Sequence, residues 1–247
     1  MRNRSAEVVV GDVGVSYPAA NGGRLRALDG LSLRVAPGEL LAVVGPSGCG
    51  KSTLLELLCG LLEPDSGSIV CGGAVLMPQR DLLLAWLSAL DNAALALRIS
   101  GSSRARARER AGALFAELGL EGFQAARPHE LSGGMRQRVA FLRTLLSGKP
   151  VLCLDEPFGA LDAITRSEMQ EWLGRTLAKE PRTTVLVTHD VEEAVLLADR
   201  VAVLSPRPGR VLEQITIALE RPRRRTDRAV VALRERALGA LALGGAQ

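Results

Sequence analysis

One glycine-rich segment carries residue types that bind phosphate. It has a glycine, four residues, a second glycine, then lysine and serine, and comprises Gly45, Pro46, Ser47, Gly48, Cys49, Gly50, Lys51, Ser52 and Thr53. Glycines let backbone N–H groups turn toward phosphate oxygens, and a following helix adds the positive end of its dipole. Lys51 offers a mobile charge to β- and γ-phosphates, and the Ser52 hydroxyl can ligate Mg²⁺. Since lysine occurs elsewhere only at Lys149 and Lys179, we reject a chance glycine-rich turn and predict a nucleotide-binding loop.

Two carboxylates follow an apolar run that predicts a buried strand at 151–154. Asp155, at the carboxyl end of that strand and beside the phosphate loop, is placed to hold Mg²⁺ through its water shell. Glu156 comes next and is the candidate general base for a water attacking the γ-phosphate. A strand followed by Asp-Glu is common by itself. Its combination with the phosphate loop predicts hydrolysis of a nucleotide.

A second helix start has anion-binding character. Ser132, Gly133 and Gly134 precede a helical pattern, and the free N–H groups and dipole of a helix start attract anions. The alternative is an ordinary helix in which Ser132 is the N-cap. Two phosphate-binding helix starts in one chain indicate a nucleotide held between two copies.

The segment 131–138, Leu-Ser-Gly-Gly-Met-Arg-Gln-Arg, resembles the signature sequence of ABC ATPases, and other motifs of that family follow in order. The resemblance covers roughly residues 8–217. It implies ATP and Mg²⁺ as cofactors, with Ser52, Gln79 and Asp155 at the metal. It also implies that Tyr17 stacks on adenine, that Gln79 contacts Mg²⁺ or the attacking water, that Asp162 communicates across a dimer, and that His189 orients the γ-phosphate and Glu156.

The alternation of apolar patterns predicts an α/β core. A continuous apolar strand at 40–44 leads into the phosphate loop and a helix at 51–58, and strands and helices alternate again from 151 to 217. Between them, about 81–147 reads as helical, with one helix from Ser102 or Ser103 to Gly119. We therefore expect a P-loop NTPase core, RecA-like, with a mostly parallel sheet, an antiparallel β part and an inserted α-helical subdomain. The predicted nucleotide-binding domain is 1–220, and 221–247 is a basic linker with a short C-terminal helix.

The basic residues are unevenly distributed. The net charge is +4, and arginines cluster at 104–110 and at 221–228 without interleaved aromatic residues. Stacking on aromatics is typical of single-stranded nucleic-acid binding, so no nucleic-acid partner is expected. A solvated helix face and a basic tail near an anionic membrane explain the two clusters better.

Several features favour a reduced, cytoplasmic compartment. No run of about 18 apolar residues exists to span a bilayer, and the first residues lack the apolar core of a signal peptide. The four cysteines, Cys49, Cys59, Cys71 and Cys153, have no metal-ligand spacing. Cys49 lies within the phosphate loop, where oxidation would affect binding.

The resemblance distinguishes among ABC proteins. The interval between Lys51 and Ser132 leaves no room for the long coiled coil of chromosome-associated members, and the chain carries one nucleotide domain and no membrane domain. It therefore resembles the stand-alone motor subunit of a transporter. We expect a homodimer bound to a transmembrane permease at the cytoplasmic face of the inner membrane, served indirectly by a solute-binding protein.

The segment after Gln79 resembles importer ATPases for nitrate, aliphatic sulfonates and taurine, although Ala85 stands where those have proline. An importer of another small molecule, such as a thiamine precursor, is the alternative, and a non-transport ABC ATPase is a remoter one. Residues 82–90 are uncharged and centred on Trp86. We expect Trp86 to contact the permease; the alternative is that this run folds inward as core.

Overall fold

The computed structural model describes residues 6–19 and 22–244 of the chain. Its larger sheet has the strand order β5-β6-β7-β3-β8-β9, in which every neighbouring pair is parallel except β8 and β9. The strands are β3 (Leu40–Val44), β5 (Ala74–Met77), β6 (Val151–Asp155), β7 (Thr183–Thr188), β8 (Arg200–Leu204) and β9 (Val211–Thr216). Strands β3, β6 and β7 are buried along their whole length, as in a sheet covered on both faces, although β7 includes three threonines.

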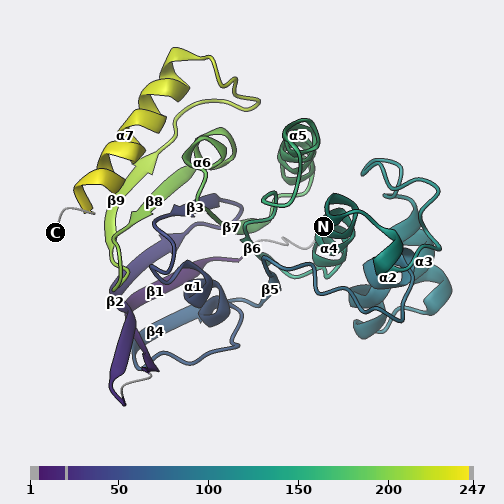
Figure 1. The fold of residues 1–247 in the computed structure, drawn as a ribbon, viewed down its shortest axis with the longest axis horizontal. Coiled ribbons are helices and arrows are strands. Elements are labelled where there is room, and N and C mark those ends of the chain that lie inside the picture. Colours follow the sequence, from purple (N-terminus) through teal and green to yellow (C-terminus); the bar gives the residue numbers. More distant parts are fainter. Residues whose placement is uncertain (1–5, 20–21, 245–247) are drawn as a thin grey trace.

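A smaller antiparallel sheet has the order β2-β1-β4, formed by β1 (Val8–Pro18), β2 (Arg24–Val35) and β4 (Ser66–Cys71). Helix α1 (Lys51–Leu58) lies beside it (Figure 1). Leu54 and Leu55 of α1 share one hydrophobic core with β1 and β2 and with one face of the larger sheet, where Val43 and Val185 point. The helix that follows the phosphate loop is thus fixed by packing on both sheets.

The opposite face of the larger sheet is covered by helices. These are α4 (Gly133–Leu145), α5 (Ala163–Lys179) and α6 (Val191–Leu197), whose apolar side chains join a second core with Leu40, Ala42 and Leu152. Trp172 of α5 is buried in that core against Phe141. Figure 1 shows α2 (Ala89–Ile99) and α3 (Arg104–Gly112) grouped with α4 at one end of the molecule. The predicted α/β class with inserted helices is confirmed.

One predicted helix is shorter than its sequence pattern. Helix α3 begins after the N-cap Ser103 but ends at Gly112 rather than Gly119. Residues 113–119 form turns that bury Phe115 and Leu118, and Arg138 of α4 donates to the Leu118 carbonyl at 2.7 Å. Within these turns Leu114 and Phe115 N–H donate to carbonyls three residues earlier, Ala111 at 3.2 Å and Gly112 at 3.1 Å, and the Arg138 contact satisfies a carbonyl at their end.

The C-terminal helix α7 (Arg228–Gly244) is longer than the predicted short helix and packs Val230 and Ala237 into the core. Before it, Arg223 donates hydrogen bonds to carbonyls at the end of α6, including Val195 at 2.8 Å and Ala198 at 2.6 Å. Burial lowers the pKa of Arg223 to about 10. Arg223 thus caps a helix instead of facing a membrane, a role that the charge cluster did not predict.

Other clustered arginines also form ion pairs. Arg104 and Arg108 of α3 lie 3.2 Å and 2.7 Å from the carboxylate of Asp91 on α2, so this part of the first cluster links two helices. In the second cluster Arg221 pairs with Asp199. No helix within the described residues is long and apolar enough to cross a membrane. The predicted boundary between the domain and its tail at residue 220 stays a prediction. Residues 1–5 of that domain and 245–247 of that tail lie outside the described residues.

Candidate active site

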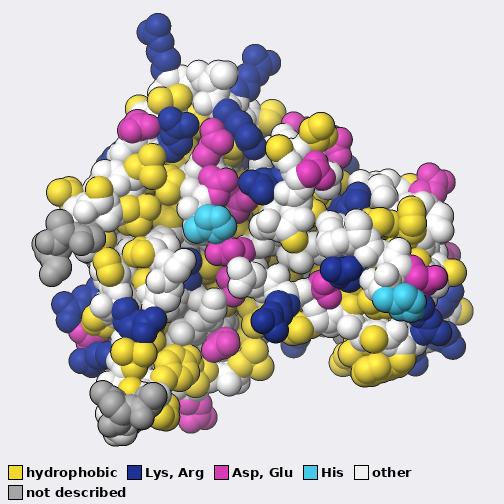
Figure 2. Space-filling model, viewed as in Figure 1, with side chains coloured by type: hydrophobic (Ala, Val, Ile, Leu, Met, Phe, Trp, Pro, Cys, Tyr) yellow, Lys and Arg dark blue, Asp and Glu magenta, His cyan; other side chains and the backbone are white. Residues whose placement is uncertain are grey.

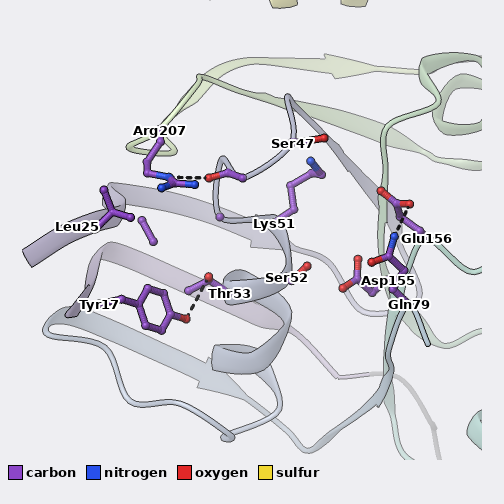
Figure 3. A pocket seen from close by; sticks show the side chains of 13 residues that line it. Tyr17, Leu25, Ser47, Lys51, Ser52, Thr53, Gln79, Asp155, Glu156 and Arg207 are labelled. Carbon is purple, nitrogen blue, oxygen red and sulfur yellow. Dashed lines mark hydrogen bonds between the residues drawn. The ribbon is translucent and has the colours of Figure 1, made fainter. Parts of the chain in front are cut away.

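A pocket of about 510 Å³ opens beside the phosphate loop, and Figure 3 shows its side chains. It lies where the smaller sheet, the phosphate loop and the carboxyl ends of the parallel strands meet. In open α/β sheets this edge is the usual place for a ligand. The residues that line it are Tyr17, Leu25, Ala27, Ser47, Gly48, Gly50, Lys51, Ser52, Thr53, Gln79, Asp155, Glu156 and Arg207.

The phosphate loop connects β3 to α1, as predicted. Gly50 precedes the helix with a φ of +101°, and a Cβ there would lie 2.6 Å from a Leu28 methyl and 2.9 Å from the Ala27 carbonyl oxygen, so only glycine fits. Lys51 is buried, and its Nζ donates to the carbonyls of Gly45 at 2.8 Å and Pro46 at 3.0 Å. The ammonium is held inside the loop whose backbone surrounds it.

Asp155 and Ser52 provide oxygen atoms at the base of the pocket (Figure 3). Burial raises the pKa of the Asp155 carboxyl; a hydrogen bond with Ser52 opposes that rise, and the neighbouring Glu156 carboxylate adds to it. Carboxylate and hydroxyl oxygens are ligands that suit Mg²⁺. Within the described residues, no three His, Cys, Asp or Glu side chains are grouped to hold a metal by themselves. A magnesium ion here would therefore complete its shell with phosphate and water.

Three strand ends bring Gln79, Glu156 and His189 together. They follow β5, β6 and β7, which are parallel neighbours, so their carboxyl ends share one edge. Gln79 Nε2 donates to Glu156 Oε2 at 3.0 Å, and His189 Nδ1 lies 3.0 Å from Glu156 Oε1. Glu156 has a φ of +46°, unusual for a residue with a side chain, and its N–H donates to the Val187 carbonyl at 2.8 Å. The carboxylate is held at the pocket from both sides.

Tyr17 lies at the other end of the pocket, near Leu25 (Figure 3). Its hydroxyl is 3.2 Å from Thr53 Oγ1 at the start of α1, which fixes the ring beside the phosphate loop. An aromatic ring held there offers a face on which a planar base can stack.

Cys49 of the phosphate loop is completely buried. Burial raises the pKa of its thiol, although the nearby Lys51 opposes the rise. Because thiolate character and access control cysteine oxidation, the structure gives no support for a redox-sensitive phosphate loop.

The signature residues lie outside the pocket of their own chain. Ser132 is the N-cap of α4, and its Oγ accepts a hydrogen bond from Met135 N–H at 3.2 Å; neither it nor Gly133 or Gly134 is among the lining residues. Asp162 is the N-cap of α5, and hydrogen bonds from the Thr165 backbone and hydroxyl lower the pKa of its carboxyl. The structure therefore places the signature residues apart from the phosphate loop's own pocket.

Residues 82–88 form an irregular segment, and helix α2 begins only at Ala89. The buried Asn92 holds this segment: its Oδ1 accepts from Leu84 N–H at 2.8 Å, and its Nδ2 donates to the Leu84 and Ser88 carbonyls at 3.1 Å. Trp86 is 70% exposed and Leu82 60% exposed. The alternative that Trp86 folds inward as core is wrong.

These features coincide with a known family. A family model described as "ABC transporter" matches residues 28–159, more than half of the chain. The chain belongs to the ABC transporter family. As a member it is an ATPase.

Similar ABC proteins include a taurine import ATP-binding protein, TauB, of Chromobacterium violaceum, which is 44% identical over 92% of this chain and 92% of its own length. An aliphatic sulfonates import ATP-binding protein, SsuB 1, of Rhodococcus jostii is 47% identical over 87% and 86% of the two chains. A dimeric ATP-binding cassette, solved in a post-hydrolysis state with ADP and Pi, matches with a TM-score of 0.79 at 27% identity, covering 86% of this chain and all of the other.

Sequence reasoning missed part of the lining of the pocket beside the phosphate loop. Leu25 and Ala27 come from β2, and Arg207 comes from the loop between β8 and β9, more than 150 residues after the phosphate loop. None of these three residues belongs to a motif on which the resemblance to ABC ATPases was based. The only local signal was the turn-forming composition of Pro206 to Gly209.

Proposed function

We propose that this chain is the ATP-hydrolysing subunit of an importer for a small sulfonate, taurine-like or nitrate-like solute. The observation that carries the proposal is the position of Glu156 between Gln79 and His189, at the same pocket as the phosphate loop. A carboxylate held by two neighbours at a phosphate site suits a general base that activates water. The names of the similar proteins supply the direction of transport and the solute class.

The lining residues support a definite division of roles. Tyr17 stacks on the adenine, and the backbone N–H groups of the phosphate loop bind the phosphates together with Lys51. Ser52, Asp155 and Gln79 hold Mg²⁺, which neutralises charge on the phosphates. Glu156 takes a proton from the attacking water, and His189 positions the Glu156 carboxylate and the γ-phosphate.

Two copies of the chain form the complete site. Ser132, Gly133 and Gly134 lie outside their own pocket, so we assign them to the ATP of the partner subunit, and Asp162 to communication across the dimer. The solved cassette that this chain resembles is dimeric, which supports a head-to-tail homodimer. Closure of the dimer over ATP and its reopening after hydrolysis would drive the transport cycle.

The exposed segment near Gln79 supports contact with a permease. Trp86 projects from a backbone that Asn92 holds in place, and large exposed aromatic residues are frequent anchors of protein interfaces. Asp81, two residues after Gln79, pairs with Arg136 of α4 at 3.0 Å. This pair connects the nucleotide site, the segment 82–88 and the signature helix. We therefore place the chain peripherally at the cytoplasmic face of the inner membrane, served indirectly by a solute-binding protein.

Contact with a permease through residues 82–88 fits a helical subdomain at about 81–147, inserted in a domain of residues 1–220 that is followed by a tail at 221–247.

An alternative solute is a thiamine-precursor type of compound. A formylaminopyrimidine import ATP-binding protein, ThiZ, of Halalkalibacterium halodurans is 46% identical over 73% of this chain and 74% of its own.

The test is uptake of labelled taurine, ethanesulfonate, nitrate and formylaminopyrimidine by cells that lack this gene and carry it on a plasmid. The wild-type chain should restore uptake of a sulfonate or nitrate, and Glu156→Gln should not. If only the uptake of formylaminopyrimidine is restored, the solute is of the thiamine-precursor type instead. A purified chain that does not hydrolyse ATP at all would contradict the proposal itself.

A further inference from the structure

The loop between β8 and β9 packs directly on the phosphate loop. Gly209 N–H donates to the Ala27 carbonyl at 2.8 Å, and its own carbonyl accepts from Asp29 N–H at 3.2 Å. A Cβ at Gly209 would lie 2.1 Å from the Cys49 carbonyl oxygen, so no other residue fits there without movement of the backbone. The two loops are therefore in contact through their main chains.

The same loop is braced internally. The Ser205 hydroxyl lies 2.9 Å from the Pro206 carbonyl and 2.8 Å from the Pro208 carbonyl, and it accepts from Arg210 N–H at 2.9 Å. Two prolines further restrict the backbone. The residue between them, Arg207, is presented by a preorganised support.

Arg207 points from this support over the phosphate loop. Its Nε donates to the Gly48 carbonyl at 2.9 Å, and one terminal nitrogen lies 2.6 Å from the place of a Gly48 Cβ. Figure 3 shows the guanidinium at the rim of the pocket, between the end that holds Tyr17 and Leu25 and the side chain of Lys51. A guanidinium has five N–H donors, so most of its hydrogen-bonding capacity is left for a ligand.

Within the part of the chain that the structure describes, no carboxylate compensates the charge of Arg207. Among the described residues, no carboxylate lies within ion-pair distance of Arg207. Arg210, in the same loop, differs: its guanidinium pairs with Asp29, and this hydrogen bond is the main cause that lowers the pKa of Asp29. One loop thus carries Arg210, which pairs with Asp29 and does not line the pocket, and Arg207, which lines it.

We propose that Arg207 binds the phosphate chain of the nucleotide from the rim of the pocket, opposite Lys51. The pocket contains two carboxylates, Asp155 and Glu156, and a nucleotide keeps a net negative charge even with Mg²⁺ bound, so Lys51 alone would not balance the negative charge there. A second cation is what a polyphosphate ligand requires, and a planar guanidinium matches phosphate oxygens in a bidentate manner. This inference rests on the proposed function, because it assigns a further residue to the same nucleotide site.

The experiment measures the dissociation constant of MgADP, which is not hydrolysed, by calorimetry at several salt concentrations. Arg207→Gln should weaken binding about tenfold or more, the value of a charge-assisted hydrogen bond. Arg207→Lys should retain part of the affinity. Arg210→Gln is the matched control, since it removes an arginine of the same loop, and it should bind as the wild type does. The thermal midpoint of nucleotide-free Arg207→Gln should equal that of the wild type.

Salt dependence separates direct binding from mere support of the phosphate loop. A direct ionic contact is screened by salt, so the affinity of Arg207→Gln should fall less steeply with salt than that of the wild type. Wild-type affinity in Arg207→Gln, or weakened affinity with an unchanged salt slope, would overturn the proposal while leaving the ATPase function intact. Absence of MgADP binding by the wild-type chain would instead overturn the proposed function, and this inference with it.

Discussion

His189 Nδ1 lies 3.0 Å from Glu156 Oε1, so the residue after β7 positions the carboxylate that follows β6. Gln79, after β5, holds the other oxygen of the same carboxylate. The pairing of parallel strands places all three at one edge, although the chain separates Gln79 from Glu156 by 77 positions and Glu156 from His189 by 33 more. Removal of the Gln79 or the His189 side chain should change the position of the Glu156 carboxylate.

Glu156→Gln should bind ATP but hydrolyse it slowly. Glutamine preserves the shape and a hydrogen-bonding oxygen but cannot accept the proton of the attacking water. Loss of a general base typically lowers kcat by about 10²–10⁴-fold. Steady-state phosphate release and equilibrium ATP binding are the measurements. Lys51→Ala should instead weaken binding itself, because it removes the buried ammonium of the phosphate loop. Hydrolysis by Glu156→Gln at the wild-type rate would show that another group is the base.

A mixture of Lys51→Ala and Ser132→Arg subunits should dimerise with ATP better than either variant alone. The two residues lie on different parts of one chain, and only the first lines its own pocket. In the mixed dimer both changes fall on one composite site and leave the other composite site intact. Size-exclusion chromatography with ATP measures dimer formation. Equal loss in all three samples would contradict sharing of the nucleotide between subunits.

Trp86→Ala should fold and bind ATP like the wild type but lose contact with the permease. Its side chain is 70% exposed and the adjoining backbone is held by Asn92, so its removal leaves no cavity. Co-purification with the permease and uptake in cells are the readouts. Ile99→Ala is the control, because Ile99 is 79% exposed at the end of α2, outside the segment 82–88. Normal uptake by Trp86→Ala would place the permease contact elsewhere.

Glu193 should make the stability of the protein depend on pH. Burial raises the pKa of its carboxyl from 4.5 to about 7, although hydrogen bonds with Thr188 and Gln170 oppose the rise. Between these pH values the native state keeps a proton that the unfolded chain has lost. Because of Glu193, the free energy of unfolding should therefore fall as pH rises from about 4.5 to 7, by about 3 kcal/mol, and stay constant above that.

Glu193→Gln removes this titration and can keep a hydrogen-bonding oxygen near Gln170. The gain in the free energy of unfolding of this variant over the wild type should be larger at pH 8 than at pH 5. Urea denaturation at both values measures the difference, and contributions from other groups cancel between the two proteins. An equal difference at both pH values would show that Glu193 is ionised in the native state at low pH.

The amino-acid sequence by itself determined those features that depend on neighbouring residues. The phosphate loop and α1 and the apolar strands β3 and β6 were predicted close to their observed positions, and Ser103 was one of two candidate N-caps. In each, the signal is local: glycines permit a tight loop, continuous apolar residues require burial on both sides, and a serine satisfies free N–H groups at a helix start.

Only the tertiary structure decided which distant groups meet. The exposure of Trp86 depends on Asn92, and the position of Arg207 depends on contact between the 205–210 loop and the phosphate loop. Arg223 and Arg207 each stand next to a proline in the sequence, yet one caps α6 from a half-buried position and the other lies over the phosphate loop at the pocket. The role of a charged side chain depends on which carbonyls and carboxylates surround it, and packing of elements far apart in the chain brings those groups together.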